Sequence, residues 1–243
     1  MGTKKYEIDF TEGKVLGKII AFALPVIFSG FMQTLFNVVD MMVVGQFVGD
    51  KALAAVGSTS SLINLLVQLF LGISMGVTIV VSQGYGARDG DKMSRASHTA
   101  IAISILGGLF LAVLGVCLAR TLLELMGSPD DVIDMATTYV RVYFAGMPLI
   151  LLYNFTSAIM RAYGDNKRPL YFLTASGILN VVLNLVFVLC FHMSVEGVAI
   201  ATFVSQGVAA FMNLHCLMRI DNGCRIEIKK TRVHKKELFE IFR

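Results

Sequence analysis

Charged side chains are scarce in this chain of 243 residues. Asp, Glu, Lys and Arg together make up 16% of the sequence, whereas a soluble domain usually carries about 25%. Hydrophobic residues reach 56%, and the mean hydropathy is positive. This balance excludes an ordinary soluble domain and indicates a membrane protein.

Long stretches of the chain lack charged residues altogether, and a membrane-spanning helix needs about 20 consecutive apolar residues. Six charge-free blocks are about that long or longer, at 19–39, 52–87, 96–119, 142–160, 169–195 and 197–218. The first block continues past Asp40, because residues 41–48 are apolar again. We therefore predict an all-α fold, a polytopic membrane protein built as a six-transmembrane-helix bundle.

Several processing and metal-binding signals are missing. The first apolar stretch is too long for a secretory signal peptide, and residue 6 is Tyr where a myristoylation site carries Ser or Thr. The four cysteines show no CxxC spacing, and no histidine has a second ligand at metal-binding spacing. We therefore expect no cofactor and no resident metal ion.

Basic residues are few on one side of the predicted membrane and frequent on the other. Of the 21 Lys and Arg residues, 18 lie in the N-terminal segment, in the loops after the second and fourth blocks, or in the C-terminal tail. The positive-inside rule then places both termini in the cytoplasm. We predict a cytoplasmic segment over 1–17, a six-span lobe over 18–219 and a basic cytoplasmic linker over 220–243. These charges flank the spans without stacking aromatics, so we expect no nucleic-acid partner.

One acid interrupts the apolar run LFNVVDMMVVG at residues 35–45. A carboxylate inside the membrane is costly unless it is paired, protonated or exposed to a water-filled cavity, so Asp40 is a functional candidate by default. Burial favours the neutral acid, whereas a bound cation favours the carboxylate. Asp40 can therefore take up a proton or a cation and release it when solvent access changes.

Helix geometry predicts the neighbours of Asp40. At about 1.5 Å per residue, Asp40 lies about 12 Å below the outer end of the first helix. Asn184 and Thr202 fall at the same depth in the fifth and sixth spans, and Asn180 lies one turn deeper. We predict that Asp40, Asn180, Asn184 and Thr202 form one proton- or cation-binding site, with oxygen ligands that suit a hard monovalent cation.

Other polar residues recur at helical spacing, as Ser29, Gln33, Asn37 and Asp40 do on the first span. Such stripes should face the bundle interior or a water-filled cavity, which makes Gln33, Asn37 and Gln206 candidates for lining a cavity. An alternative is interhelical hydrogen bonding that only holds the bundle together. We apply that interpretation to Gln33, Asn64, Gln68, Asn154 and Asn213.

Pro25 lies in the inner half of the first span and removes one backbone hydrogen bond there, so we predict a hinge, with a static kink as the alternative. Arg141 lies close enough to the outer surface for its side chain to reach water.

Several short motifs resemble those of one transporter family. They are the Ala-Leu-Pro sequence ending at Pro25, the run 36–45 around Asp40, LAAVG at 53–57, SQGYGA at 82–87 and RAYGD at 161–165. Together they resemble the N-terminal half of the MATE (multidrug and toxic compound extrusion) family over nearly all of residues 12–243. The resemblance implies a secondary transporter of two six-helix lobes that exports cationic or amphipathic compounds against entry of H⁺ or Na⁺. It also implies that Asp40, Asn180, Asn184 and Thr202 belong to the polar cluster of the N-terminal lobe.

Two departures from the family pattern affect this expectation. The archaeal type of cluster has a second carboxylate where this chain has Asn184, which argues against a relay of two acids. The chain also has six spans instead of twelve, and residues 235–243 resemble the lead-in 12–18 before the first span. We therefore expect one lobe of a truncated or split transporter in the cell membrane, whose partners are membrane lipid, a small amphipathic or cationic substrate, and a second lobe or another copy.

Competing functions differ in the polar groups that they require. A lipid-linked oligosaccharide or polysaccharide flippase of the same superfamily would carry basic residues in its cavity, and the spans here offer an acid and no lysine. An intramembrane aspartyl protease needs a second acid at matching depth, and a rhomboid-like protease needs GxSxG; both are missing, so we expect no enzyme. A channel or a non-transporting scaffold subunit remains an alternative, which gradient-driven flux would test.

Overall fold

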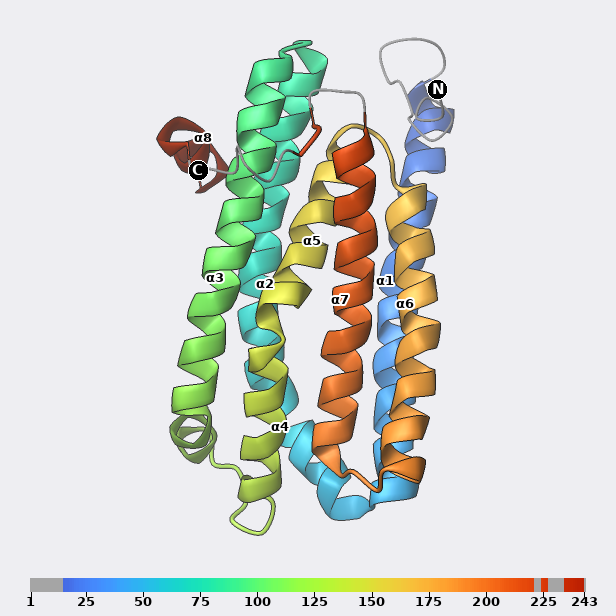
Figure 1. Ribbon diagram of the computed structural model, residues 1–243, viewed down its shortest axis with the longest axis vertical. Helices are drawn as coiled ribbons and strands as arrows, with labels where there is room; N and C mark the ends of the chain where they lie inside the picture. The colour runs from blue at the N-terminus through green and yellow to red at the C-terminus, as the bar shows by residue number, and fades with distance from the viewer. Residues whose placement is uncertain (1–14, 221–223, 227–233, 243) are drawn as a thin grey trace.

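The computed structural model describes residues 15–220, 224–226 and 234–242, and within them it contains helices and no strand. Figure 1 shows long helices that cross the molecule from end to end in alternating directions. In chain order the elements are α1 (Val15–Val43), the π-helical turn η1 (Val44–Val48), α2 (Asp50–Gly86), α3 (Gly90–Leu125), α4 (Ile133–Ala145), α5 (Met147–Ala162), α6 (Lys167–Leu185), the π-helical turn η2 (Val186–Cys190), α7 (Val195–Arg219) and α8 (Lys235–Phe242). The predicted all-α membrane fold is confirmed.

Five of the helical segments are long and apolar enough to cross a membrane alone, and α4 with α5 makes a sixth span that is bent by 48°. The six predicted spans are therefore present, and the protein is a multi-pass membrane protein. The first span continues past Asp40 to Val48, as the apolar residues 41–48 predicted. The π-helical turn η1 ends the first span in the same way that η2 ends the fifth.

The fourth span differs from its prediction at the N-terminal end. It begins at Ile133, earlier than the charge-free block at residue 142, because it includes Asp134 and Arg141. Arg141 is exposed, and its Nε donates a hydrogen bond to the carbonyl oxygen of Val116 on α3 (3.3 Å). A criterion that requires charge-free residues therefore truncates a span whose first turns carry charged side chains.

The bend in the fourth span lies at Gly146. Pro148 follows at the start of α5, where its missing N–H costs no helical hydrogen bond. A Cβ atom at Gly146 would overlap the Phe203 side chain of α7, so the small residue allows α7 to pack directly against the bend. The bend at Gly146 is therefore held in the bundle by direct packing against Phe203.

The helices divide into two groups that α5 and α7 connect. α3 packs on α4 and α5, α6 packs on α1 and α7, and α7 packs on α5. In Figure 1, α1 and α6 lie side by side at one edge and α3 at the other. Large apolar side chains point outward along the spans, among them Leu65, Leu106 and Phe211, which is typical of a lipid-facing surface.

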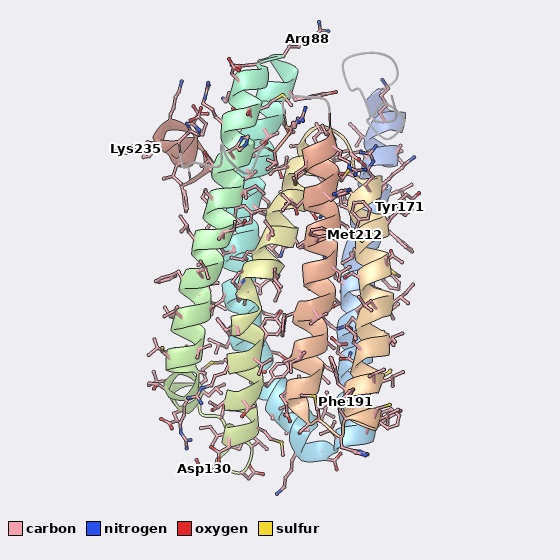
Figure 2. The ribbon with its side chains drawn as sticks, viewed as in Figure 1. Arg88, Asp130, Tyr171, Phe191, Met212 and Lys235 are labelled. Carbon is pink, nitrogen blue, oxygen red and sulfur yellow. The ribbon has the colours of Figure 1, made fainter. Side chains whose placement is uncertain are left out.

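Charged side chains lie at both ends of the bundle. In Figure 2, Arg88 and Lys235 lie toward one end and Asp130 at the other, as the predicted topology requires. The short helix α8 packs on α2 and α3, where Glu237 pairs with Arg95 (2.6 Å). Parts of the predicted terminal segments, residues 1–14, 221–223, 227–233 and 243, lie outside the described residues.

Candidate functional site

Asp40 lies near the C-terminal end of α1, on the side that packs against α6. The Asn184 side chain donates from Nδ2 to Asp40 Oδ1 (2.5 Å), and Asn184 is fully buried, whereas Asp40 is half-buried. A carboxylate that accepts an amide hydrogen bond in an apolar environment is held in one geometry by a charge-assisted bond. The contact joins two helices that are 144 residues apart in the sequence.

Two further polar groups complete a cluster around Asp40. Asn184 Nδ2 also lies 3.4 Å from Asn180 Oδ1, and Asn180 Nδ2 lies 3.4 Å from Thr202 Oγ1 on α7. The Thr202 hydroxyl itself donates to the carbonyl oxygen of Val198 on its own helix (2.9 Å). The structure therefore brings together all four residues that the sequence grouped by depth, while their role in ion binding stays a prediction.

The cluster retains unused hydrogen-bonding capacity. Asn184 Oδ1 is buried and has no hydrogen-bond partner among the described residues, although an amide oxygen can accept two hydrogen bonds. If Asp40 is protonated, a rotated Asn184 amide can accept from its O–H. If a cation binds, the amide and hydroxyl oxygens can join the carboxylate as ligands. The same four side chains can thus accommodate either occupant.

A cavity of about 570 Å³ lies beside this cluster, between α1, α2, α4, α5, α6 and α7. Asp40, Asn180 and Thr202 reach its wall, and the three predicted lining residues Gln33, Asn37 and Gln206 also lie on it. Asn184 is absent from the wall, because it lies behind Asp40 within the helix packing. Asn184 therefore supports the acid from behind.

The structure separates the amides that were interpreted as interhelical hydrogen-bonding groups. Asn213 on α7 fits that interpretation, because its Nδ2 donates to Ser157 Oγ on α5 (2.8 Å) and it is fully buried. The others line the cavity instead: Gln33, Asn64, Gln68 and Asn154. Together with Asn37, Asn180 and Gln206, they make seven amides that give the wall neutral hydrogen-bonding groups on five helices.

Three tyrosines line the cavity although the sequence analysis did not predict them as site residues. Tyr139 and Tyr143 lie on α4 with ring centroids 6.1 Å apart, Tyr153 lies on α5, and all three line the same cavity as Asp40. Tyr139 precedes the charge-free block that begins at residue 142, which left it outside the predicted span. Its spacing of four residues from Tyr143 was the available signal. Aromatic faces near one carboxylate favour cationic or aromatic ligands.

Pro25 lies within α1, which continues through it as a single helix, and it does not line the cavity. The Ser29 hydroxyl donates to the carbonyl oxygen of Pro25 (2.8 Å), a local bond that often accompanies helix bending. The predicted hinge role is untested by this geometry.

Comparison with known proteins agrees with the motifs. The MatE family model matches residues 25–186. The chain is 32% identical over 213 residues to the probable multidrug resistance protein YpnP of Bacillus subtilis (strain 168), covering 87% of this chain and 47% of that protein. It is 22% identical over 234 residues to the multidrug export protein MepA of Staphylococcus aureus (strain MRSA252), covering 96% of this chain and 52% of that protein.

Solved structures agree with the fold. A crystal structure described as MATE in the bent conformation aligns with a TM-score of 0.85 at 25% identity, over 93% of this chain and 50% of that one. An outward-facing multidrug resistance MATE family transporter aligns with a TM-score of 0.84 at 25% identity over the same shares. The chain thus spans about half the length of the curated relatives and solved structures that it matches.

Proposed function

The chain belongs to the MatE family, and from that premise we propose that it forms one six-span lobe of a transporter in the cell membrane. The transporter would export cationic or amphipathic compounds in exchange for H⁺ or Na⁺. The observation that carries this proposal is the position of Asp40, which lies on the cavity wall and is held by Asn184 of another helix.

Asp40 is the only charged residue among the described residues that line the cavity. A cationic substrate and a coupling cation would therefore compete for a single negative charge. Competition makes the binding of one ligand weaken the binding of the other, which is the thermodynamic requirement for exchange. The neutral amides and the tyrosines can bind the uncharged parts of a substrate without binding the coupling ion tightly.

The same cluster supports either coupling ion. Protonation of Asp40 would remove the charge that attracts a cationic substrate. A Na⁺ ion would instead retain the carboxylate and use the oxygens of Asn180, Asn184 and Thr202 as ligands. With one carboxylate in the cluster, we propose a single-acid exchange step.

Coupling also requires alternating access. We place both termini in the cytoplasm, so that the cluster lies in the outer half of the membrane, and we propose that α1 moves about Pro25 when the occupant of Asp40 changes. A second six-helix lobe, from a longer chain or another copy, would complete the substrate path, as in transporters built from repeats.

The test is efflux of a cationic dye from proteoliposomes that contain the full-length protein. With an imposed pH gradient and, separately, a Na⁺ gradient, Asp40→Asn should reduce gradient-driven efflux about 10- to 100-fold, the effect expected for losing a charged interaction. Asp50→Asn, which removes an exposed acid at the start of α2, is the matched control and should retain efflux. Efflux by Asp40→Asn that keeps both its rate and its pH dependence would refute the proposal.

A further inference from the structure

The helix α1 is attached to the bundle through few contacts. It packs chiefly on α6, and none of the residues in its most apolar window is buried. Further attachments to α2 and α7 come from η1, beyond its outer end. A helix packed mainly on one neighbour can move with little loss of apolar contact, so its polar attachments determine which part moves.

The backbone of α1 is weakest around Pro25. Proline has no N–H, so the carbonyl oxygen of Ala21 loses its helical donor. The next carbonyl, that of Phe22, keeps the N–H of Val26 as its helical donor, and a carbonyl oxygen can accept a second hydrogen bond from a side chain of another element. Local bending concentrates at such a position.

A side chain from the turn between α5 and α6 binds at this weak point. Asn166 Nδ2 donates to the carbonyl oxygen of Phe22 (2.8 Å), three residues before Pro25. Asn166 is buried, and its Oδ1 has no hydrogen-bond partner among the described residues. The donor bond to Phe22 therefore accounts for the orientation of this amide, because the opposite orientation would direct two oxygen atoms at each other.

The turn that carries Asn166 is itself firmly held. Gly164 has a φ of +94°, a left-handed conformation that suits glycine, and the N–H of Asp165 donates to Met160 O (3.1 Å). Asp165 is buried, accepts from the N–H of Arg168 (3.1 Å) and pairs with its guanidinium (3.3 Å). Asn166 is thus fixed from both sides and can act as an anchor for α1.

We propose that Asn166 is a positioning residue that holds the first part of α1, residues 15–24, against the α5–α6 turn. We call this part, which precedes Pro25 and lies at the cytoplasmic end in the proposed topology, the foot of α1. With the foot held, movement that starts at Asp40 is confined to the part of α1 beyond Pro25. The proposal rests on the proposed function, because it assigns the fixed end of the helix whose other end responds to the coupling ion. Asn166 touches neither the cavity nor the Asp40 cluster, so its effect must pass through α1.

Distances between spin labels test the clamp in the full-length protein, with the exposed Cys117 and Cys190 replaced by serine. A foot pair joins Leu16→Cys to Ala87→Cys, and an outer pair joins Met42→Cys to Leu125→Cys; all four sites are exposed. In the wild type, a change of pH or Na⁺ should shift the outer pair and leave the foot pair unchanged.

Two variants remove the donor of the clamp, Asn166→Ala and the nearly isosteric Asn166→Asp. In each variant, the state in which the foot has separated from the turn should be about fivefold more populated than in the wild type, the factor expected for the loss of one net hydrogen bond. Gradient-driven efflux should fall, while equilibrium binding of the dye should be retained. Lys167→Ala, at the exposed next residue, is the control and should match the wild type. Having two variants keeps the test valid if one of them folds poorly.

The outcomes separate the two proposals. A foot pair that is unchanged in both Asn166 variants overturns the clamp and leaves the proposed function standing. If Asp40→Asn changes neither the outer pair nor efflux, the proposed function fails, and the clamp, which requires movement driven from Asp40, fails with it.

Discussion

A methyl group added at Gly177 should disturb the candidate site without touching any of its polar residues. Gly177 on α6 lies under the ring of Phe36 on α1, and a Cβ atom there would overlap that ring. Phe36 precedes Asp40 by one helical turn, and Gly177 precedes Asn184 by about two turns, so both pairs lie along the same interface. Gly177→Ala must therefore push α1 away from α6 or displace the Phe36 ring.

The expected loss of efflux in Gly177→Ala follows from comparing the free-energy cost of overpacking with the free energy of the Asn184–Asp40 hydrogen bond. Overpacking of this kind usually costs about 1–3 kcal/mol. A hydrogen bond to a charged group, such as that between Asn184 and Asp40, contributes about 1.5–3 kcal/mol. Because the two ranges overlap, separation of the helices can break this bond, and we expect gradient-driven efflux to fall about tenfold or more.

The assay compares dye efflux and thermal stability among three variants. Gly72→Ala is the control, because Gly72 is exposed on α2 and a methyl group there would meet no other atom within 4 Å. Adding Phe36→Leu to Gly177→Ala removes ring volume where the methyl group was added, and it should recover most of the lost efflux. A Gly177→Ala variant that behaves like Gly72→Ala, or a double variant no better than the single one, would show that the α1–α6 contact at Phe36 does not hold the Asp40 cluster in place.

Three other perturbations have defined outcomes. Asn184→Asp adds a second carboxylate beside Asp40 and should strengthen Na⁺ binding measured by calorimetry; unchanged affinity would count against a shared site. Tyr143→Leu should weaken binding of a cationic dye about two- to fivefold, whereas Tyr143→Phe should retain it, since the ring face carries the attraction. Burial has the largest single effect on the pKa of Glu237 and acts to raise it, but the hydrogen bond from Arg95, a backbone hydrogen bond and the nearby positive charges together outweigh it and lower this pKa. The docking of α8 should therefore hold above about pH 4 and weaken as the pH falls below it, as hydrogen exchange would show, and Glu237→Gln should remove this dependence.

Counting residues from the end of each span predicted the Asp40 cluster correctly, because the helices that carry these residues have a regular rise per residue between the cluster and the span end. Asp40, Asn184 and Thr202 lie on three elements, and a rise of about 1.5 Å per residue was enough to place them at one level. Helical periodicity then indicated that they face inward. Depth and periodicity do not distinguish a residue on the cavity wall from one behind it. Asn184 lies behind Asp40 and is not on the wall.

The features that the sequence did not reveal depend on contacts between distant elements. The bend at Gly146 reflects packing against Phe203, which lies in another span. The bond from Asn166 to Phe22 joins a loop to a helix 144 residues earlier. Local spacing carries no information about such pairs, since each partner alone resembles an ordinary loop or helix residue.

Under the proposed function, the weak attachment of α1 would let one acid control a whole helix. Along its apolar length α1 offers side chains to lipid, so moving it exchanges protein contacts for lipid contacts of similar energy. Polar bonds to other elements then contribute a large share of what holds it: Asn166 at the foot and Asn184 at Asp40. Of these two, only the bond at Asp40 involves a group whose charge changes with the occupant. On the proposed mechanism, a change at Asp40 would therefore alter one end of α1 while the other end stays held, and Pro25 lies between the two ends.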